Sequence, residues 1–239
     1  MPVLPGVLWG GLTVTTLAGG FGPFLDDDVA LQETGDIPAE LLIEDTGFGA
    51  CQLGALKDGV QLREIDGLVT LWNADRSWGT PQLVEAIDRA AEEVRWLIPD
   101  ADPLVVGDMS LEGGGYFAGH KSHRDGLDAD IGLFSGHARQ THGFNDLDAT
   151  TFDVASNWIL IRAFLKTGLV ERILLDQSLI ELLRDYLSST GELTAEEIDQ
   201  VFPKNPHERW NRDGILHQGV VHHATSHRNH LHLRVLCAP

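Results

Sequence analysis

Two histidines and three aspartates lie within eleven residues of one another, from His120 to Asp130, in the stretch AGHKSHRDGLDADIGLF. Imidazole nitrogens and carboxylate oxygens are the groups with which proteins bind catalytic zinc, and they also serve as general acids and bases. A polar stretch that contains Asp and Gly is equally typical of a surface turn. A metal site is therefore indicated only if another part of the chain supplies further ligands.

A second group of candidate ligands lies about a hundred residues later, in HHATSHRNHLHLRV. All eleven histidines of the chain stand at or beyond residue 120, and seven of them lie between His207 and His232. The last part of this stretch alternates strictly between polar and apolar residues. On a strand, His230, His232 and Arg234 share one face, and the leucine and valine residues between them share the other.

The stretch LDADIGLF has the same alternation. On a strand its apolar residues face the core, and Asp128 and Asp130 face the opposite side. If the two strands pair in one sheet, Asp130 and His232 lie on a shared surface, and His123 reaches it from the preceding glycine-rich loop. Two imidazoles and one carboxylate suit a catalytic zinc, which keeps a position for an acidified water.

The rest of the sequence predicts a mixed fold. Helices are predicted from Thr80 with Pro81 at the first helical position, over 153–166 with Gly168 after the end, over 178–187, and from Thr194 with Glu197 completing a capping box. Strand-like segments lie at 103–110, 127–134, 172–176 and 230–236. Because helices and strands do not alternate regularly, we expect an α+β domain with an antiparallel sheet.

Composition excludes several classes of protein. The chain has 239 residues, of which 43% are hydrophobic and 22% charged, as in a globular protein. A formal charge of −19 argues against a nucleic-acid-binding surface. The first 56 residues contain eight acidic residues and no Lys or Arg, so we expect an acidic, weakly structured extension over 1–58. Its apolar opening has neither the basic start of a signal peptide nor the length of a membrane span.

The chain has two cysteines, Cys51 and Cys237. Two cysteines cannot form a cysteine-rich zinc site. They are either two free buried thiols or one disulfide, and a disulfide would imply an oxidising compartment.

The motifs GHKSHRDGLDAD and HRNHLHLR together resemble those of the penicillin-insensitive murein endopeptidases. These belong to a wider group of zinc peptidases with the lysostaphin-type enzymes, the D-Ala-D-Ala dipeptidases and the hedgehog domain. The pattern of the family is a His, six residues and an Asp, followed by a distant His-x-His. Three further stretches, DRSWGTPQLVEAIDRAA, LVVGDMSLEGGG and SNWILIRAFL, extend the likeness over about residues 59–234.

The resemblance implies a zinc metallopeptidase domain over 59–239, with a small antiparallel sheet that carries the site and helices that flank it. The implied zinc ligands are His123, Asp130 and His232. The implied catalytic residues are His230 as general base, His227 beside it to orient or stabilise the transition state, and His120 lining the site. Asp125 and Asp128 are left with turn or supporting roles.

The activity implied by the resemblance is hydrolysis of the D-Ala–meso-diaminopimelate cross-links of peptidoglycan stem peptides, in the periplasm or outside the cell. A D,D-carboxypeptidase or dipeptidase, a non-haem iron oxygenase and a zinc-bearing binding module without catalysis remain as alternatives. The chain departs from the family in three respects, one of which is that it lacks several cysteines of the best-known members. Arg124 stands where the family usually has Gln, and the acidic extension is not part of the family pattern.

Overall fold

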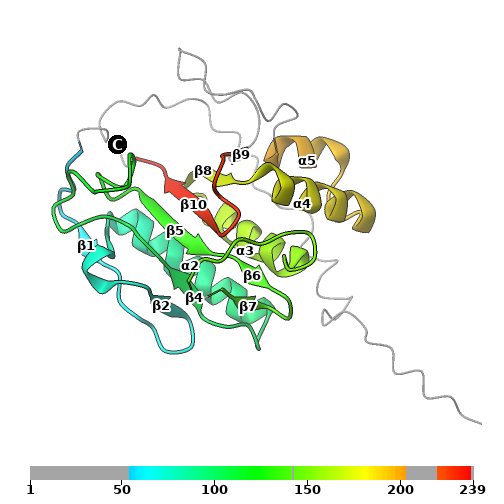
Figure 1. The fold of residues 1–239 in the computed structure, drawn as a ribbon, viewed down its shortest axis with the longest axis horizontal. Coiled ribbons are helices and arrows are strands. Elements are labelled where there is room, and N and C mark those ends of the chain that lie inside the picture. The colour runs from blue at the N-terminus through cyan, green and yellow to red at the C-terminus, as the bar shows by residue number, and fades with distance from the viewer. Residues whose placement is uncertain (1–53, 142, 203–219, 238–239) are drawn as a thin grey trace, which may run out of the picture. The chain divides into compact units, whose positions relative to one another are not determined.

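Six strands form the main sheet of the computed structural model (Figure 1), which describes residues 54–141, 143–202 and 220–237. All of these belong to the second of two units into which the chain divides, Thr34–Pro239. In spatial order the strands are β2 (Val69–Leu71), β4 (Leu104–Val106), β5 (Asp128–Gly132), β10 (His230–Val235), β8 (Val170–Leu175) and β9 (Val221–His223). The two strands predicted to carry ligands, β5 and β10, are neighbours at the centre.

The sheet is mixed, so the prediction of an antiparallel sheet is correct for its centre and wrong at both edges. The pairs β4–β5, β5–β10 and β10–β8 are antiparallel, whereas β2–β4 and β8–β9 are parallel. The edge pairs are parallel because helices connect their strands. Helix α2 (Pro81–Leu97) lies between β2 and β4 in the chain, and α4 (Gln177–Thr190) and α5 (Ala195–Val201) lie between β8 and β9. A helical crossover returns the chain in the same direction, which makes the joined strands parallel.

The predicted helices are all present, and their caps explain where they begin. The Thr80 side chain accepts a hydrogen bond from the Leu83 amide at the start of α2. The Asp153 side chain caps α3 (Val154–Lys166) in the same way. At α5 the Thr194 capping box is formed with both of its hydrogen bonds. Each cap satisfies an amide that has no partner inside the helix.

Helix α4 is longer than predicted. It begins at Gln177, because Asp176, directly after β8, is its N-cap, and it ends at Thr190, because Gly191 is its C-cap with φ +69°. Glycine adopts this left-handed conformation without steric cost, which allows the helix to end there. The sequence prediction of 178–187 therefore placed the helix correctly and missed its last turn.

Several short elements were not predicted. These are β1 (Val60–Gln61) paired with β3 (Trp78–Gly79), β6 (Phe134–Ser135) paired with β7 (Arg139–Gln140), the 3₁₀ turn η2 (Ala74–Arg76), and the two edge strands of the main sheet, β2 and β9. Segments of two or three residues carry too little periodicity to be recognised from sequence.

The apolar faces of β5 and β10 form part of the core. Ala129, Ile131, Leu231 and Leu233 have no exposed surface, and α2 and α3 lie behind the sheet in Figure 1. Fully burying a leucine contributes roughly 1.5–3 kcal/mol, so this face holds the two strands firmly in register. The alternation of the strands then places their polar side chains on the opposite face.

Three other predictions concern the described residues only in part. The predicted extension, residues 1–58, lies almost entirely outside the described residues, so its boundary stays a prediction. Cys237 is disulfide-bonded, whereas Cys51 lies outside the described residues. Within the residues that the structure describes, every helix is too short or too polar to cross a membrane.

Candidate metal centre

The connection from β4 to β5 carries His120 and His123 and is held in place by glycines. At Gly114 an added Cβ would lie 2.3 Å from the Arg124 carbonyl oxygen and 2.4 Å from the Leu56 nitrogen. At Gly126 it would lie 2.6 Å from a Leu56 methyl carbon. Both glycines have φ near +75°, a region that other residues rarely adopt. The glycines therefore allow the connection to fold tightly back over the polar face of β5.

The register of β5 and β10 brings the predicted ligands of the two motifs together. His232 lies directly opposite Asp130, and Arg234 lies directly opposite Asp128. Since residues two apart on a strand share a face, all four side chains lie on the same side of the sheet. The structure thus forms the shared surface that the alternation of the two segments predicted.

Three atoms converge at this surface. The His232 Nδ1 atom lies 3.1 Å from Asp130 Oδ1 and 3.2 Å from His123 Nε2, and His123 Nε2 lies 3.3 Å from Asp130 Oδ1. Ligand atoms around a tetrahedral zinc lie about 3.3 Å apart, because each zinc–ligand bond is about 2.0–2.1 Å long. The spacing of these three atoms and their chemistry fit one transition-metal ion.

Hydrogen bonds on the far side of each imidazole select the nitrogen that faces this point. The His123 Nδ1–H donates to the Met109 carbonyl oxygen at 2.7 Å, since a carbonyl can only accept, and this leaves Nε2 as the nitrogen that faces Asp130. The His232 Nε2–H donates to Asp128 Oδ1 at 2.9 Å, which directs Nδ1 toward Asp130. Such partners are what metal-binding histidines usually have.

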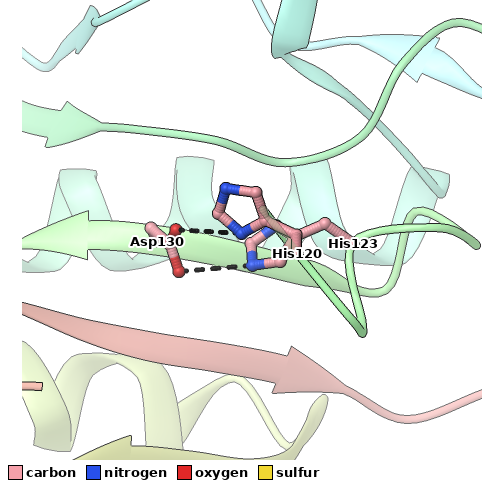
Figure 2. A group of neighbouring side chains, drawn as sticks. All are labelled: His120, His123 and Asp130. Atoms are coloured by element: carbon pink, nitrogen blue, oxygen red, sulfur yellow. Dashed lines mark ion pairs between the residues drawn. The ribbon is translucent and has the colours of Figure 1, made fainter. Parts of the chain in front are cut away.

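His120 belongs to the same group of side chains (Figure 2). Its nitrogens, those of His123 and the oxygens of Asp130 offer ligand atoms that all lie within 4.8 Å of one another. His120 Nδ1 is 3.9 Å from Asp130 Oδ2, and its Nε2 hydrogen-bonds to Asp108 Oδ2 at 2.9 Å. The structure therefore contains two overlapping sets of three possible metal ligands. Both sets include His123 and Asp130, and the third member is His120 in one set and His232 in the other.

A cluster around His120 restricts its ring. Its ring centroid lies 4.8 Å from that of Phe117, and the Arg76 guanidinium lies 5.2 Å above the Phe117 ring. Arg76 also forms an ion pair with Asp108 at 3.1 Å. The result is a closed group of four side chains in which His120 is held from two sides. Asp108 lies within the predicted strand-like segment 103–110, two residues after the end of β4, but the sequence contained no sign that it would reach His120.

His230 lies at the edge of the same centre. Its Nε2 is 3.4 Å from Asp130 Oδ1, and its Nδ1–H donates to the Asn229 side-chain oxygen at 2.6 Å. Burial lowers the pKa of His230 to about 4, although the nearby Asp130 carboxylate acts in the opposite direction. The imidazole is therefore neutral at pH 7 and presents an unprotonated Nε2 toward the cluster.

His227 lies next to His230, with ring centroids 4.9 Å apart, and 6.0 Å from the His232 ring. Its Nδ1–H donates to the Thr225 carbonyl oxygen at 2.8 Å. Burial lowers its pKa below the ordinary value for histidine. All six residues predicted from the sequence to bind metal or to act in catalysis thus lie in one cluster.

Opposite charges dominate the electrostatics of the centre. Burial alone would raise the pKa of Asp130, but hydrogen bonds from His123 and His232 outweigh it and hold the pKa well below its usual range. Burial alone would lower the pKa of His232, but hydrogen bonds to Asp128 and Asp130 raise it to about 9. The cluster therefore favours a positive charge at the position where the three ligand atoms meet.

Two further features of the cluster were not anticipated. The Phe144 ring lies 5.6 Å from that of His230 and 4.9 Å from that of Trp72, whose side chain is half exposed. Arg124, which departs from the family pattern, has its guanidinium 5.7 Å above the ring of the exposed Tyr116. The contacts of Phe144 join segments distant in sequence, and neither group of contacts leaves a periodic signal.

A large part of the chain matches a known protein family. Residues 48–184, more than half of the chain, match the family described as penicillin-insensitive murein endopeptidase. A curated protein of Haemophilus influenzae with that name is 34% identical to the chain over 74 residues. That alignment covers 30% of this chain and 25% of the relative, so it spans a quarter of the relative's length. The family match ends before β10, which carries His230 and His232, and before the connection from β9 to β10, which carries His227.

Proposed function

The chain belongs to the penicillin-insensitive murein endopeptidase family, and from this premise we propose that it is a zinc-dependent endopeptidase. Its proposed substrate is the D-Ala–meso-diaminopimelate cross-link between the stem peptides of bacterial peptidoglycan, and its proposed location is the periplasm or the cell exterior. The observation that carries the proposal is the convergence of His123 Nε2, Asp130 Oδ1 and His232 Nδ1 at 3.1–3.3 Å from one another.

The donor set supports zinc as the metal. Two imidazoles and one carboxylate are the ligands of many catalytic zinc sites, which keep a fourth position for water or substrate. A zinc ion held there would supply an acidified water and an electrophile for the scissile carbonyl. His120 is the fourth side chain in reach, and we propose that it lines the site, since its Nε2 already pairs with Asp108.

His230 is the proposed general base. An unprotonated Nε2 close to the ligand atoms can accept a proton from the attacking water and later deliver it to the leaving amine. The hydrogen bond from Nδ1 to Asn229 keeps the ring in this tautomer. The low pKa of His230 ensures that the base is unprotonated at neutral pH.

His227 is the proposed partner of His230 in stabilising the transition state. Its ring packs against the ring of His230, and its Nδ1 is held by the Thr225 carbonyl, so the remaining nitrogen can face the reacting group. Charge that develops on the carbonyl oxygen is stabilised by groups already oriented toward it. Such a reaction forms no acyl-enzyme, so β-lactams, which acylate a serine, should not inhibit it.

The ligand assignment predicts that His123→Ala, Asp130→Ala and His232→Ala each remove the bound zinc. The purified wild-type chain should contain about one zinc per molecule, because three ligands and a water complete a tetrahedral site. Metal content is measured by elemental analysis after dialysis, with His120→Ala as the matched variant expected to retain zinc. If His120→Ala loses zinc and His232→Ala keeps it, then His120 rather than His232 is the third ligand.

The reaction is tested on purified peptidoglycan. The expected result is conversion of cross-linked dimeric muropeptides to monomers, read by mass spectrometry, with loss of activity on chelation and recovery on addition of zinc. Release of terminal D-Ala alone would instead identify a carboxypeptidase. Zinc binding without any product would identify a binding module, and iron in place of zinc in the purified protein would point to oxygenase chemistry.

A further inference from the structure

A buried group of charged side chains lies behind His232, on the side away from the converging ligand atoms. Asp128 has no exposed surface, Arg234 is 5% exposed and Asp125 is 8% exposed. Charges this deeply buried cost several kcal/mol of desolvation each, and such ion pairs are weak evidence for a gain in stability. Their arrangement around one imidazole calls for an explanation beyond stability.

The register of the sheet sets the geometry of this group. On β5 Asp128 and Asp130 share a face, and on β10 His232 and Arg234 occupy the positions opposite them. The His232 ring lies between the two carboxylates, with Nε2 at 2.9 Å from Asp128 Oδ1 and Nδ1 at 3.1 Å from Asp130 Oδ1. The two nitrogens of one ring thus have different carboxylate partners.

Arg234 determines how Asp128 is oriented. Its Nη1 donates to Asp128 Oδ2, its Nη2 to Asp125 Oδ2 at 3.2 Å, and its Nε to Glu171 Oε2 at 3.3 Å. A guanidinium has donors only, so the Asp128 oxygen that faces it must accept. The other oxygen, Oδ1, is then free to accept only from His232. The carboxylate is held at both oxygens and cannot rotate without losing both contacts.

We propose that Asp128 is a positioning residue for the metal site: it holds the proton of His232 on Nε2, so that Nδ1 is the ligand atom, and Arg234 keeps Asp128 in the orientation that does this. The inference rests on the proposed function, because it concerns the same metal. It assigns a role to two residues that the sequence motif left aside. Asp128 touches neither substrate nor metal and acts only through His232.

The substitution Asp128→Asn tests the proposal with almost no change of shape. Arg234 requires an acceptor, so the asparagine oxygen turns toward it and the amide NH₂ faces His232 Nε2. This donor moves the proton of His232 to Nδ1, the ligand atom. Zinc affinity should fall about 10- to 100-fold, which is usual for the loss of such a partner. Affinity is measured by competition with a chromophoric chelator, independently of activity.

Glu171→Gln is the matched control. It removes a carboxylate contact from Arg234 but leaves Asp128, Asp125 and His232 in place. Its zinc affinity should stay within about threefold of the wild-type value, while the unfolding midpoint of the metal-free protein reports any general loss of stability in both variants. Wild-type affinity in Asp128→Asn, or an equal loss in Glu171→Gln, would overturn the proposal.

A measurement on the wild-type chain keeps the test valid even if Asp128→Asn does not fold. Loaded with ¹¹³Cd²⁺ and labelled with ¹⁵N, the protein should show coupling of cadmium to His232 Nδ1 and a slowly exchanging proton on Nε2. Coupling through Nε2 would overturn the positioning role but leave His232 as a ligand. The absence of coupling to either nitrogen, with metal retained by His232→Ala, would overturn the ligand set and the positioning role together.

Discussion

His230 and His232 stand two residues apart on the same face of β10, yet their surroundings give them opposite chemistry. His232 lies between two carboxylates, which raise its pKa to about 9. Burial lowers the pKa of His230 to about 4, and its nearest carboxylate oxygen is 3.4 Å away. The surroundings of His232 thus favour a positive charge, as a metal ligand requires, whereas those of His230 favour the neutral ring that a general base requires. Two histidines can therefore take the separate roles of ligand and base.

His230→Ala should retain zinc and lose activity. Removal of a general base typically costs 10²- to 10⁴-fold in rate, and the three converging ligand atoms are not changed. The measurements are zinc content and the initial rate on peptidoglycan. His137→Asn is a suitable control, since His137 has φ +65° and asparagine tolerates this conformation. Full activity in His230→Ala would remove it as the base, and loss of zinc would make it a ligand.

At the scale of elements, the packing of Phe144 supports the histidine face of β10. Phe144 has φ +46°, an unfavourable conformation for an aromatic residue. Its ring lies against two glycines. A Cβ added at Gly107, which follows β4, would lie 2.3 Å from Phe144 Cε2. A Cβ added at Gly132, which pairs with His230, would lie 3.3 Å from Phe144 Cε1. The absence of side chains at these glycines makes room for the ring, which contacts the imidazole of His230.

Gly107→Ala should therefore displace the Phe144 ring and disturb His230 without substituting any ligand. A contact of 2.3 Å forces a shift, and misplacement of a catalytic group by about 1 Å can reduce the rate by roughly 10- to 100-fold. We expect a lower kcat with unchanged zinc content. Gly136→Ala is the matched control, because no atom lies within 4 Å of its added Cβ. Equal rates for the two variants would show that Phe144 does not support the base.

At the scale of the described fold, the candidate metal centre joins three separate segments. His123 comes from the β4–β5 connection, Asp130 from β5, and His232 from β10, which follows β5 by about a hundred residues in the chain. A ligand that binds only the folded state stabilises it by RT ln(1 + [L]/Kd). Metal bound at this position should therefore stabilise the pairing of β5 with β10 and the fold of the connection together.

Removal of the metal should lower the unfolding temperature. At a free zinc concentration of a hundred times Kd, the stabilisation is about 2.7 kcal/mol, which corresponds to roughly 5 to 10 °C for a chain of this size. Differential scanning calorimetry before and after chelation measures the shift, and re-addition of zinc should reverse it. His123→Ala should show no response to either treatment. An equal response in that variant would indicate a metal bound elsewhere.

Much of the centre could be predicted from local patterns. The alternation of LDADIGLF and HLHLRV correctly indicated two strands with Asp130 and His232 on one face, and the caps at Thr80 and Thr194 located the starts of two helices. Strand alternation and helix capping depend on residues close together in the chain. The antiparallel prediction failed at the edges of the sheet because strand direction there depends on the crossover helices.

By itself, the sequence determined which residues could bind a metal and which face of each strand they occupy, because both follow from residue type and a two-residue period. Only the tertiary structure decided that Asp128 is held between His232 and Arg234, that Asp108 pairs with His120, and which nitrogen of each imidazole faces the centre. These contacts join residues that are 12 to 106 positions apart. They depend on strand register and loop packing, which no local pattern of residues specifies.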